Sequence, residues 1–112
     1  MERTIDTLNI LGLDVDLIIA DEVLDSDGIE KEGVNSLALC RIWLCNQYAP
    51  SYLRMVLFHE VKELMTRHID ATGGDTHEYF QDFATIEYSV LLANKDILFG
   101  DKLARLLSDG QE

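Results

Sequence analysis

The first twenty residues contain two runs in which apolar residues stand among polar ones, and the second run alternates with the period of two that is typical of half-buried strands. One run covers residues 4–10 and a second covers 13–19, with Gly12 between them. The glycine predicts a short turn, so we expect the two strands to form a hairpin. Asp14 and Asp16 occupy polar positions of the second strand, and we interpret them as its solvated face.

A polar segment with two glycines, 21–36, separates this hairpin from an apolar run at 37–45. Asp25–Gly28 supplies only part of a calcium-loop pattern because its glycine comes too early, so we interpret the segment as an exposed acidic turn. The apolar run predicts a third, more deeply buried strand. Arg41 is its only charged residue, and we expect it at a sheet edge or facing solvent.

Residues 52–67 contain neither glycine nor proline and predict a long helix, with Ser51 as its N-cap just after Pro50. Apolar residues cover much of the helix circumference, which is typical of a helix buried at the centre of a domain. The residues at helical spacing are Leu53, Val56, Leu57, Glu60, Val61, Leu64 and Met65. A charged group buried in such a helix requires compensation by a partner or an ion.

A break at 71–74, which contains two glycines, predicts the end of this helix. We expect a second helix capped by Asp75 or Thr76 and ending near Asn94, then a shorter third helix over 97–107 with a break or cap at its glycine. The expected buried stripe of the second helix is Phe80, Phe83, Ile86, Val90 and Leu91.

These elements predict an α+β fold, with a small antiparallel sheet of about three strands packed on a C-terminal half of two to three helices. The 112 residues are expected to form a single domain over 1–112, since the length suits one hydrophobic core. The formal net charge of −12 argues against nucleic acids and anionic membranes as partners, because both are polyanions. We expect a protein or peptide partner, which the sequence does not identify.

Cys40 and Cys45 lie five residues apart in one apolar run, where an odd offset would place them on opposite faces of a strand. We therefore expect no disulfide between them. The N-terminal residues lack the basic and apolar regions of a signal peptide, and no apolar run approaches the ~18–20 residues of a membrane span. The expectation is a soluble protein of the cytoplasm, a reducing compartment.

The long helix carries the one group of side chains whose spacing suits chemistry. His59 and Glu63 are four residues apart and so lie on one helix face, with Glu60 beside His59. An imidazole and a carboxylate at this spacing can bind one metal ion, and the neighbouring glutamate can act on water as a general base. Taken one by one, the same residues also fit a satisfied core histidine and exposed helix charges.

His77 follows His59 by 18 residues, at the expected start of the second helix. If the connection folds back, His59, Glu63 and His77 form a site of two histidines and one carboxylate, which suits Zn²⁺ or another divalent first-row metal. His68 lies nine residues after His59, roughly on the opposite helix face, and we interpret it as a favourable charge at the helix C-terminus. Glu87 is a candidate supporting or alternative ligand.

The segment Val56–Met65 resembles the metal-binding helix of minimal zinc metallopeptidases of phages and prophages, a zincin-like family. In that family a hairpin, a polar loop and an apolar strand precede a His-Glu-x-x-His/Glu helix, and a later histidine opens a second helix. The resemblance covers roughly residues 5–95. It implies His59, Glu63 and His77 as zinc ligands and Glu60 as the catalytic base.

The leading functional hypothesis is therefore a zinc-dependent hydrolase, acting on peptide or amide bonds. The alternative is a non-catalytic, phage-encoded interaction protein on a zincin-like scaffold. The alternative is favoured by the small size of the chain and by Glu63, an anionic ligand that makes zinc less electrophilic than a histidine would.

Overall fold

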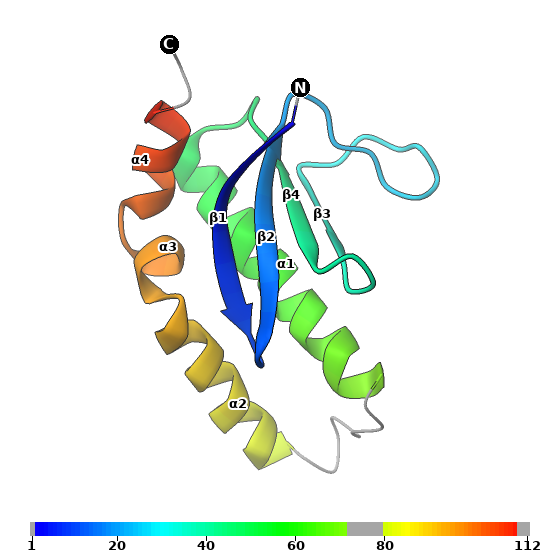
Figure 1. Ribbon diagram of the computed structural model, residues 1–112, viewed down its shortest axis with the longest axis vertical. Coiled ribbons are helices and arrows are strands. Elements are labelled where there is room, and N and C mark those ends of the chain that lie inside the picture. The colour runs from blue at the N-terminus through cyan, green and yellow to red at the C-terminus, as the bar shows by residue number, and fades with distance from the viewer. Residues whose placement is uncertain (1, 72–79, 110–112) are drawn as a thin grey trace.

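A four-stranded mixed sheet and four helices make up the described residues, 2–71 and 80–109, of the computed structural model (Figure 1). The α+β class predicted from the sequence is confirmed. The strands are β1 (Glu2–Ile10), β2 (Leu13–Ala20), β3 (Gly33–Ser36) and β4 (Arg41–Cys45). The helices are α1 (Pro50–Ala71), α2 (Phe80–Ala93), α3 (Lys95–Phe99) and α4 (Lys102–Asp109).

The predicted hairpin is confirmed: β1 and β2 pair antiparallel, and Ile10 lies opposite Leu13. Both turn residues, Leu11 and Gly12, have positive φ angles, 53° and 84°. Two positive φ angles match the right-handed twist of the strands, and glycine tolerates this backbone at no steric cost. Asp14 is exposed, as expected of the solvated strand face.

The sheet differs from the expected antiparallel one of about three strands. Its order is β1-β2-β4-β3, and β4 runs parallel to β2, whereas β3 and β4 are antiparallel. The chain reaches β4 only after β3, a four-residue strand inside the segment interpreted as a polar turn. Glycine and polar side chains gave β3 no apolar alternation, so its backbone pairing with β4 decides its conformation.

The third predicted strand begins at Arg41 rather than at residue 37. Residues 37–40 form a turn that ends at Cys40, whose φ is 51°. Arg41 is exposed, as expected, while Ile42 and Leu44 have no exposed surface. Cys40 therefore lies just before β4, so the two cysteines are not on opposite faces of one strand as expected. Both thiols are free.

Helix α1 crosses behind the sheet and contacts β3 and β4 (Figure 1). It begins at Pro50, so the N-cap assigned to Ser51 is wrong; the fixed φ of proline suits a first helical residue. Burial is confined to one stripe, because Met55 is 69% exposed. The expectation of a helix buried around most of its circumference is therefore also wrong. The buried stripe is Leu53, Leu57, Glu60, Val61, Leu64 and Met65.

The C-terminal helices line one side of β1 and α1. Asn94 ends α2 as predicted, and its side chain donates to the backbone oxygens of Asn9 (2.7 Å) and Val90 (2.9 Å). These bonds attach the helices to β1. Gly100 separates α3 from α4, where one interrupted helix was expected. The predicted caps of α2 at 75 and 76 lie outside the described residues.

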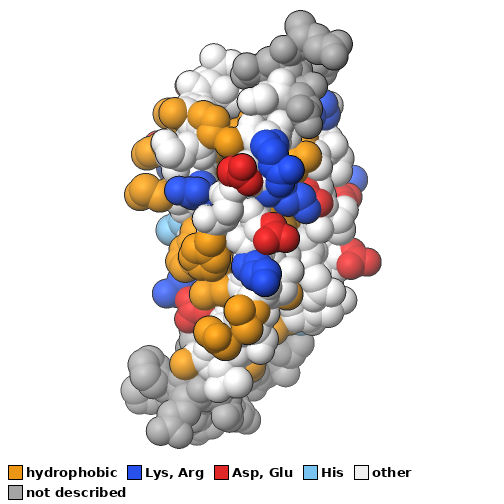
Figure 2. Space-filling view, turned by 90° about the vertical axis from the view of Figure 1, so that its left-hand side faces the viewer, with side chains coloured by type: hydrophobic (Ala, Val, Ile, Leu, Met, Phe, Trp, Pro, Cys, Tyr) orange, Lys and Arg blue, Asp and Glu red, His pale blue; other side chains and the backbone are white. Residues whose placement is uncertain are grey.

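The side of the molecule that carries the C-terminal helices shows exposed apolar side chains together with basic and acidic ones (Figure 2). Among the side chains of α2 and α3 that the structure describes, Tyr88, Leu92 and Phe99 are the large exposed hydrophobic ones. Phe99 also contacts Phe58 of α1 edge-to-face, with ring centroids 6.1 Å apart. None of the described helices is long and apolar enough to cross a membrane.

Candidate metal centre

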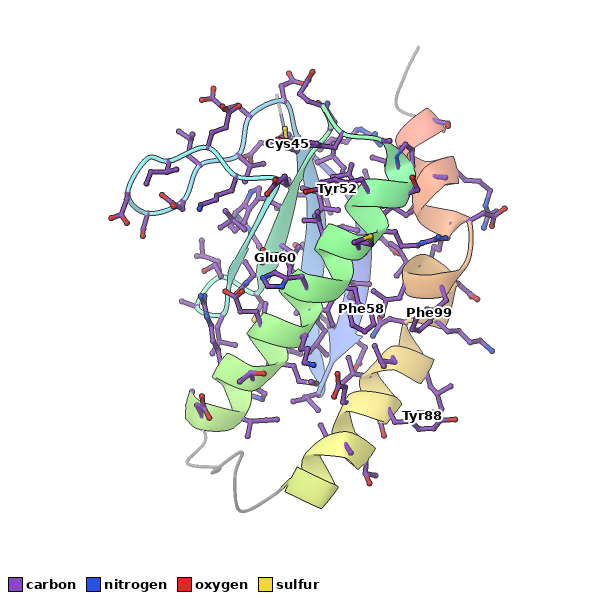
Figure 3. All side chains as sticks on the ribbon, turned by 180° about the vertical axis from the view of Figure 1, so that it is seen from behind. Cys45, Tyr52, Phe58, Glu60, Tyr88 and Phe99 are labelled. Atoms are coloured by element: carbon purple, nitrogen blue, oxygen red, sulfur yellow. The ribbon has the colours of Figure 1, made fainter. Side chains whose placement is uncertain are left out.

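Helix α1 brings three side chains together on its β3 side (Figure 3). Candidate ligand atoms of His59, Glu60 and Glu63 all lie within 4.8 Å of one another. Nε2 of His59 is 3.0 Å from Oε2 of Glu63, which is the juxtaposition that their four-residue spacing predicted. His59 is exposed to solvent, Glu63 partly so, and Glu60 is buried. The cluster is therefore open to solvent on one side.

Glu60 is the buried member, with only 6% of its surface exposed. Burial raises the pKa of its carboxyl group above the ordinary value, and the nearby charge of Glu63 raises it further. The hydrogen bond from Asn35 and the electrostatic influence of His59 and Arg67 act in the opposite direction. The net effect is a carboxyl group that accepts a proton more readily than an exposed glutamate.

Asn35 of β3 is the main partner of Glu60. Its Nδ2 donates to Oε2 of Glu60 at 2.7 Å, and its Oδ1 accepts from Arg67 at 3.2 Å. Arg67 also donates to Oε1 of Glu63 at 2.7 Å. A continuous polar network thus runs from His59 through Glu63, Arg67 and Asn35 to Glu60, and it fixes both carboxylates.

Sequence reasoning missed Asn35 and Arg67. Asn35 belongs to a strand without an apolar pattern, so nothing local placed it beside Glu60. Arg67 follows Glu63 by four residues, and that spacing on a helix is a detectable signal for an ion pair. Its second contact, with Asn35, depends on how β3 packs against α1 and has no counterpart in the sequence pattern.

Gly33 permits the close approach of β3 to α1 beside this cluster. A Cβ atom at this position would lie 2.7 Å from Cγ1 of Val56 and 3.3 Å from Cγ of Glu60. The first distance is too short for real Cβ contacts, so a side chain would push the strand away from the helix. The glycine thereby keeps Asn35 within hydrogen-bonding distance of Glu60.

A cleft of about 280 Å³ lies over the cluster, between α1 and β3. Asp25 and Lys31 of the loop before β3 also line it. The donor set at its floor, one imidazole and two carboxylates, fits Zn²⁺ or another divalent first-row cation. The three residues could therefore hold a metal ion.

The other predicted site residues lie elsewhere or outside the described chain. His77, the predicted third ligand, falls within 72–79, outside the described residues. Glu87 is paired with Lys62, whose Nζ is 3.6 Å from its carboxylate. His68 does not belong to the described cluster of candidate ligands. Within the described residues, the candidate centre therefore comes from α1, supported by β3.

The buried carboxyl group predicts a pH-dependent stability for metal-free protein. A raised pKa in the folded state means that folding favours protonated Glu60, so its contribution to stability falls as pH rises above the unfolded value, about 4.5. Glu60→Gln keeps an oxygen for Asn35 but cannot ionise. We expect the variant to melt higher than the unaltered protein at neutral pH, with the difference vanishing below about pH 4.5.

Differential scanning fluorimetry of both proteins across pH, with chelator present, measures this difference. Glu63→Gln is the matched control, because Glu63 is more exposed and its carboxylate is paired with Arg67. A Glu60→Gln variant that melts below the unaltered protein at neutral pH and above it in acid would reverse the assigned direction.

No protein-family model, curated protein or solved structure matches this chain. The resemblance to zincin-like phage metallopeptidases therefore stays a prediction. The candidate metal centre rests on the residues and the geometry of this chain alone.

Proposed function

We propose that this protein is a zinc-dependent hydrolase of zincin type that cleaves peptide or amide bonds. The observation that carries the proposal is the convergence of His59, Glu60 and Glu63 at the floor of an open cleft. His59 and Glu63 hold the metal, with His77 as the third ligand that the sequence predicts. A bound divalent ion supplies Lewis-acid polarisation of the scissile carbonyl and lowers the pKa of water.

Glu60 is the general base in this proposal. It takes a proton from the attacking water and passes it to the leaving group. Two features of the structure support this role. Burial raises the pKa of its carboxyl group, which makes it a better proton acceptor, and the hydrogen bond from Asn35 fixes one of its oxygens. Within the described residues, no protein group donates a hydrogen bond to its other oxygen, which is available to water.

The edge of the sheet supports a peptide as the substrate. β3 is the terminal strand of the sheet, and it forms one wall of the cleft. Extended peptides bind such edges by adding a strand, with main-chain hydrogen bonds that do not depend on sequence. A substrate bound along β3 would pass directly over Glu60 and His59.

The second candidate is a non-catalytic interaction protein on the same scaffold. It is favoured by the ion pairs of Glu63, whose two oxygens already contact His59 and Arg67. A cluster satisfied by its own partners is stable without a metal. The two candidates differ in whether the centre carries out hydrolysis, and only the hydrolase requires a bound metal ion.

Metal analysis of protein purified without a histidine tag tests the requirement of the hydrolase for a metal ion. After incubation with zinc and desalting, we expect about one equivalent per chain in the unaltered protein and in His68→Ala, and a large loss in His59→Ala. Less than about a tenth of an equivalent of any divalent metal after zinc is supplied would contradict the hydrolase proposal.

A further inference from the structure

The cleft continues from the candidate centre towards the N-terminus of α1. This second segment has a volume of about 380 Å³ and shares Gly33, His59 and Glu60 with the segment already described. Tyr52 and Glu60 lie on the same side of α1, facing the strands (Figure 3). Eight residues of helix place Tyr52 about 12 Å along the axis from Glu60, or some three to four residues of an extended peptide.

The aromatic ring of Tyr52 and the carboxylate of Glu32 meet in this segment, and the ring of Tyr48 lies beside that of Tyr52. The ring centroids of Tyr48 and Tyr52 are 5.4 Å apart, with their planes tilted by 32°. The Tyr52 hydroxyl donates to Oε1 of Glu32 at 3.2 Å, and Glu32 lines the same segment. The two rings remain 41% and 43% exposed, so they are available to a ligand. Aromatic faces beside a carboxylate bind lysine and arginine side chains through cation–π and ionic contacts.

The local electrostatics have the sign that a cation requires. The charge of Glu32 is the largest cause of the raised pKa of Tyr52, ahead of their hydrogen bond. The pKa of Tyr48 is raised first by burial and then by Glu32. The net charge of −12 likewise attracts cationic ligands.

Lys31 is the opposing charge. It is exposed and lines both segments of the cleft. If the positive charge of Lys31 outweighed the negative charge of Glu32, the cleft would select an acidic side chain instead. Its substitution therefore distinguishes between two opposite charge preferences.

We propose that Tyr48, Tyr52 and Glu32 form a subsite for a lysine or arginine side chain of a peptide bound in the cleft. The proposal rests on the proposed function for its peptide ligand, and it names the substrate class: peptides with a basic residue some three to four positions from the bond at the metal centre. The cation would lie against the tyrosine rings and pair with Glu32.

Peptide binding tests the subsite without requiring cleavage. The probes are N-acetylated, C-amidated octapeptides of alanine and glycine, with one tryptophan for detection and a single arginine at each position in turn. Each has a counterpart with citrulline, which keeps the shape of arginine but lacks its charge. Binding is measured by fluorescence titration to the Glu60→Gln variant supplied with zinc, so that no probe is cleaved.

At one arginine position, we expect the arginine peptide to bind about tenfold more tightly than its citrulline counterpart. Glu32→Gln and Tyr52→Leu should reduce this ratio towards one, whereas Lys31→Ala should leave it unchanged or increase it. Tyr88→Leu is the matched control, because Tyr88 is exposed on α2 and does not line the cleft. Circular dichroism of each variant verifies that it is folded.

Equal affinities for arginine and citrulline peptides at every position would overturn the subsite, as would a ratio that Glu32→Gln does not alter. Absence of binding by every probe would overturn it as well. Zinc content, measured on the same samples, keeps the two proposals apart. Arginine selectivity in protein that holds no zinc supports the subsite and rejects the hydrolase, while zinc binding without selectivity rejects the subsite alone.

Discussion

Glutamine in place of Glu60 should lower zinc-dependent peptide hydrolysis by about 10²- to 10⁴-fold, the range that a positioned general base contributes. Glutamine retains the length of the side chain and an oxygen to accept the hydrogen bond from Asn35. It cannot take a proton from water, so the chemical step loses its base while the cleft keeps its shape. Single-turnover cleavage of a peptide library, followed by mass spectrometry, measures the loss.

Zinc content decides how such a loss is interpreted. Because Glu60 lies within the ligand cluster, it could hold the metal as well as act on water. We expect Glu60→Gln to retain its zinc, which identifies Glu60 as a base. Loss of zinc together with activity would reassign Glu60 as a ligand, and hydrolysis that persists in the zinc-loaded variant would remove Glu60 from the mechanism. Lys62→Ala is the control on the same helix, because Lys62 is exposed and pairs with Glu87 rather than with the cluster.

Zinc at a hundredfold excess over its Kd should raise the free energy of unfolding by about 2.7 kcal/mol, because the ion binds the folded chain and not the unfolded one. For a domain of this length, the melting midpoint should rise by roughly 10 °C or more. Histidine ligands must be neutral to bind the metal, so the shift should weaken as pH falls. Thermal melts with zinc or with a chelator measure the shift at each pH.

Alanine substitutions assign the shift to particular ligands. His59→Ala should remove most of it, and His77→Ala should do the same if the predicted third ligand takes part. His68→Ala should leave it nearly intact, since His68 lies outside the described ligand cluster. Equal effects of His59→Ala and His68→Ala would contradict the assignment, as would a chelator that leaves the midpoint unchanged in zinc-loaded protein.

Local pattern was sufficient for the elements whose residues repeat with a clear period. The β1–β2 hairpin follows from alternation around Gly12, and α1 follows from a long apolar stripe without glycine or proline. The juxtaposition of His59 and Glu63 also follows from the sequence, because helix geometry alone brings residues four apart to one face. Those features depend on interactions between near neighbours along the chain.

Tertiary packing decided the features that join distant segments. β3 has no apolar period and exists because β4 pairs with its backbone. The sheet is mixed rather than antiparallel because β4 runs parallel to β2. Which side of α1 is buried was set by where the sheet lies, so Met55 is exposed although the helix is apolar around much of its circumference.

The environment of Glu60 depends both on local sequence and on tertiary packing. Its place beside His59 is fixed by the sequence and by helix geometry, whereas its burial, its bond to Asn35 and the bridge through Arg67 arise only when β3 packs against α1. Gly33 makes that packing possible, because a larger residue would collide with Val56. Periodic sequence therefore determined which side chains share a helix face, and burial in the tertiary structure raised the proton affinity of the central carboxyl group.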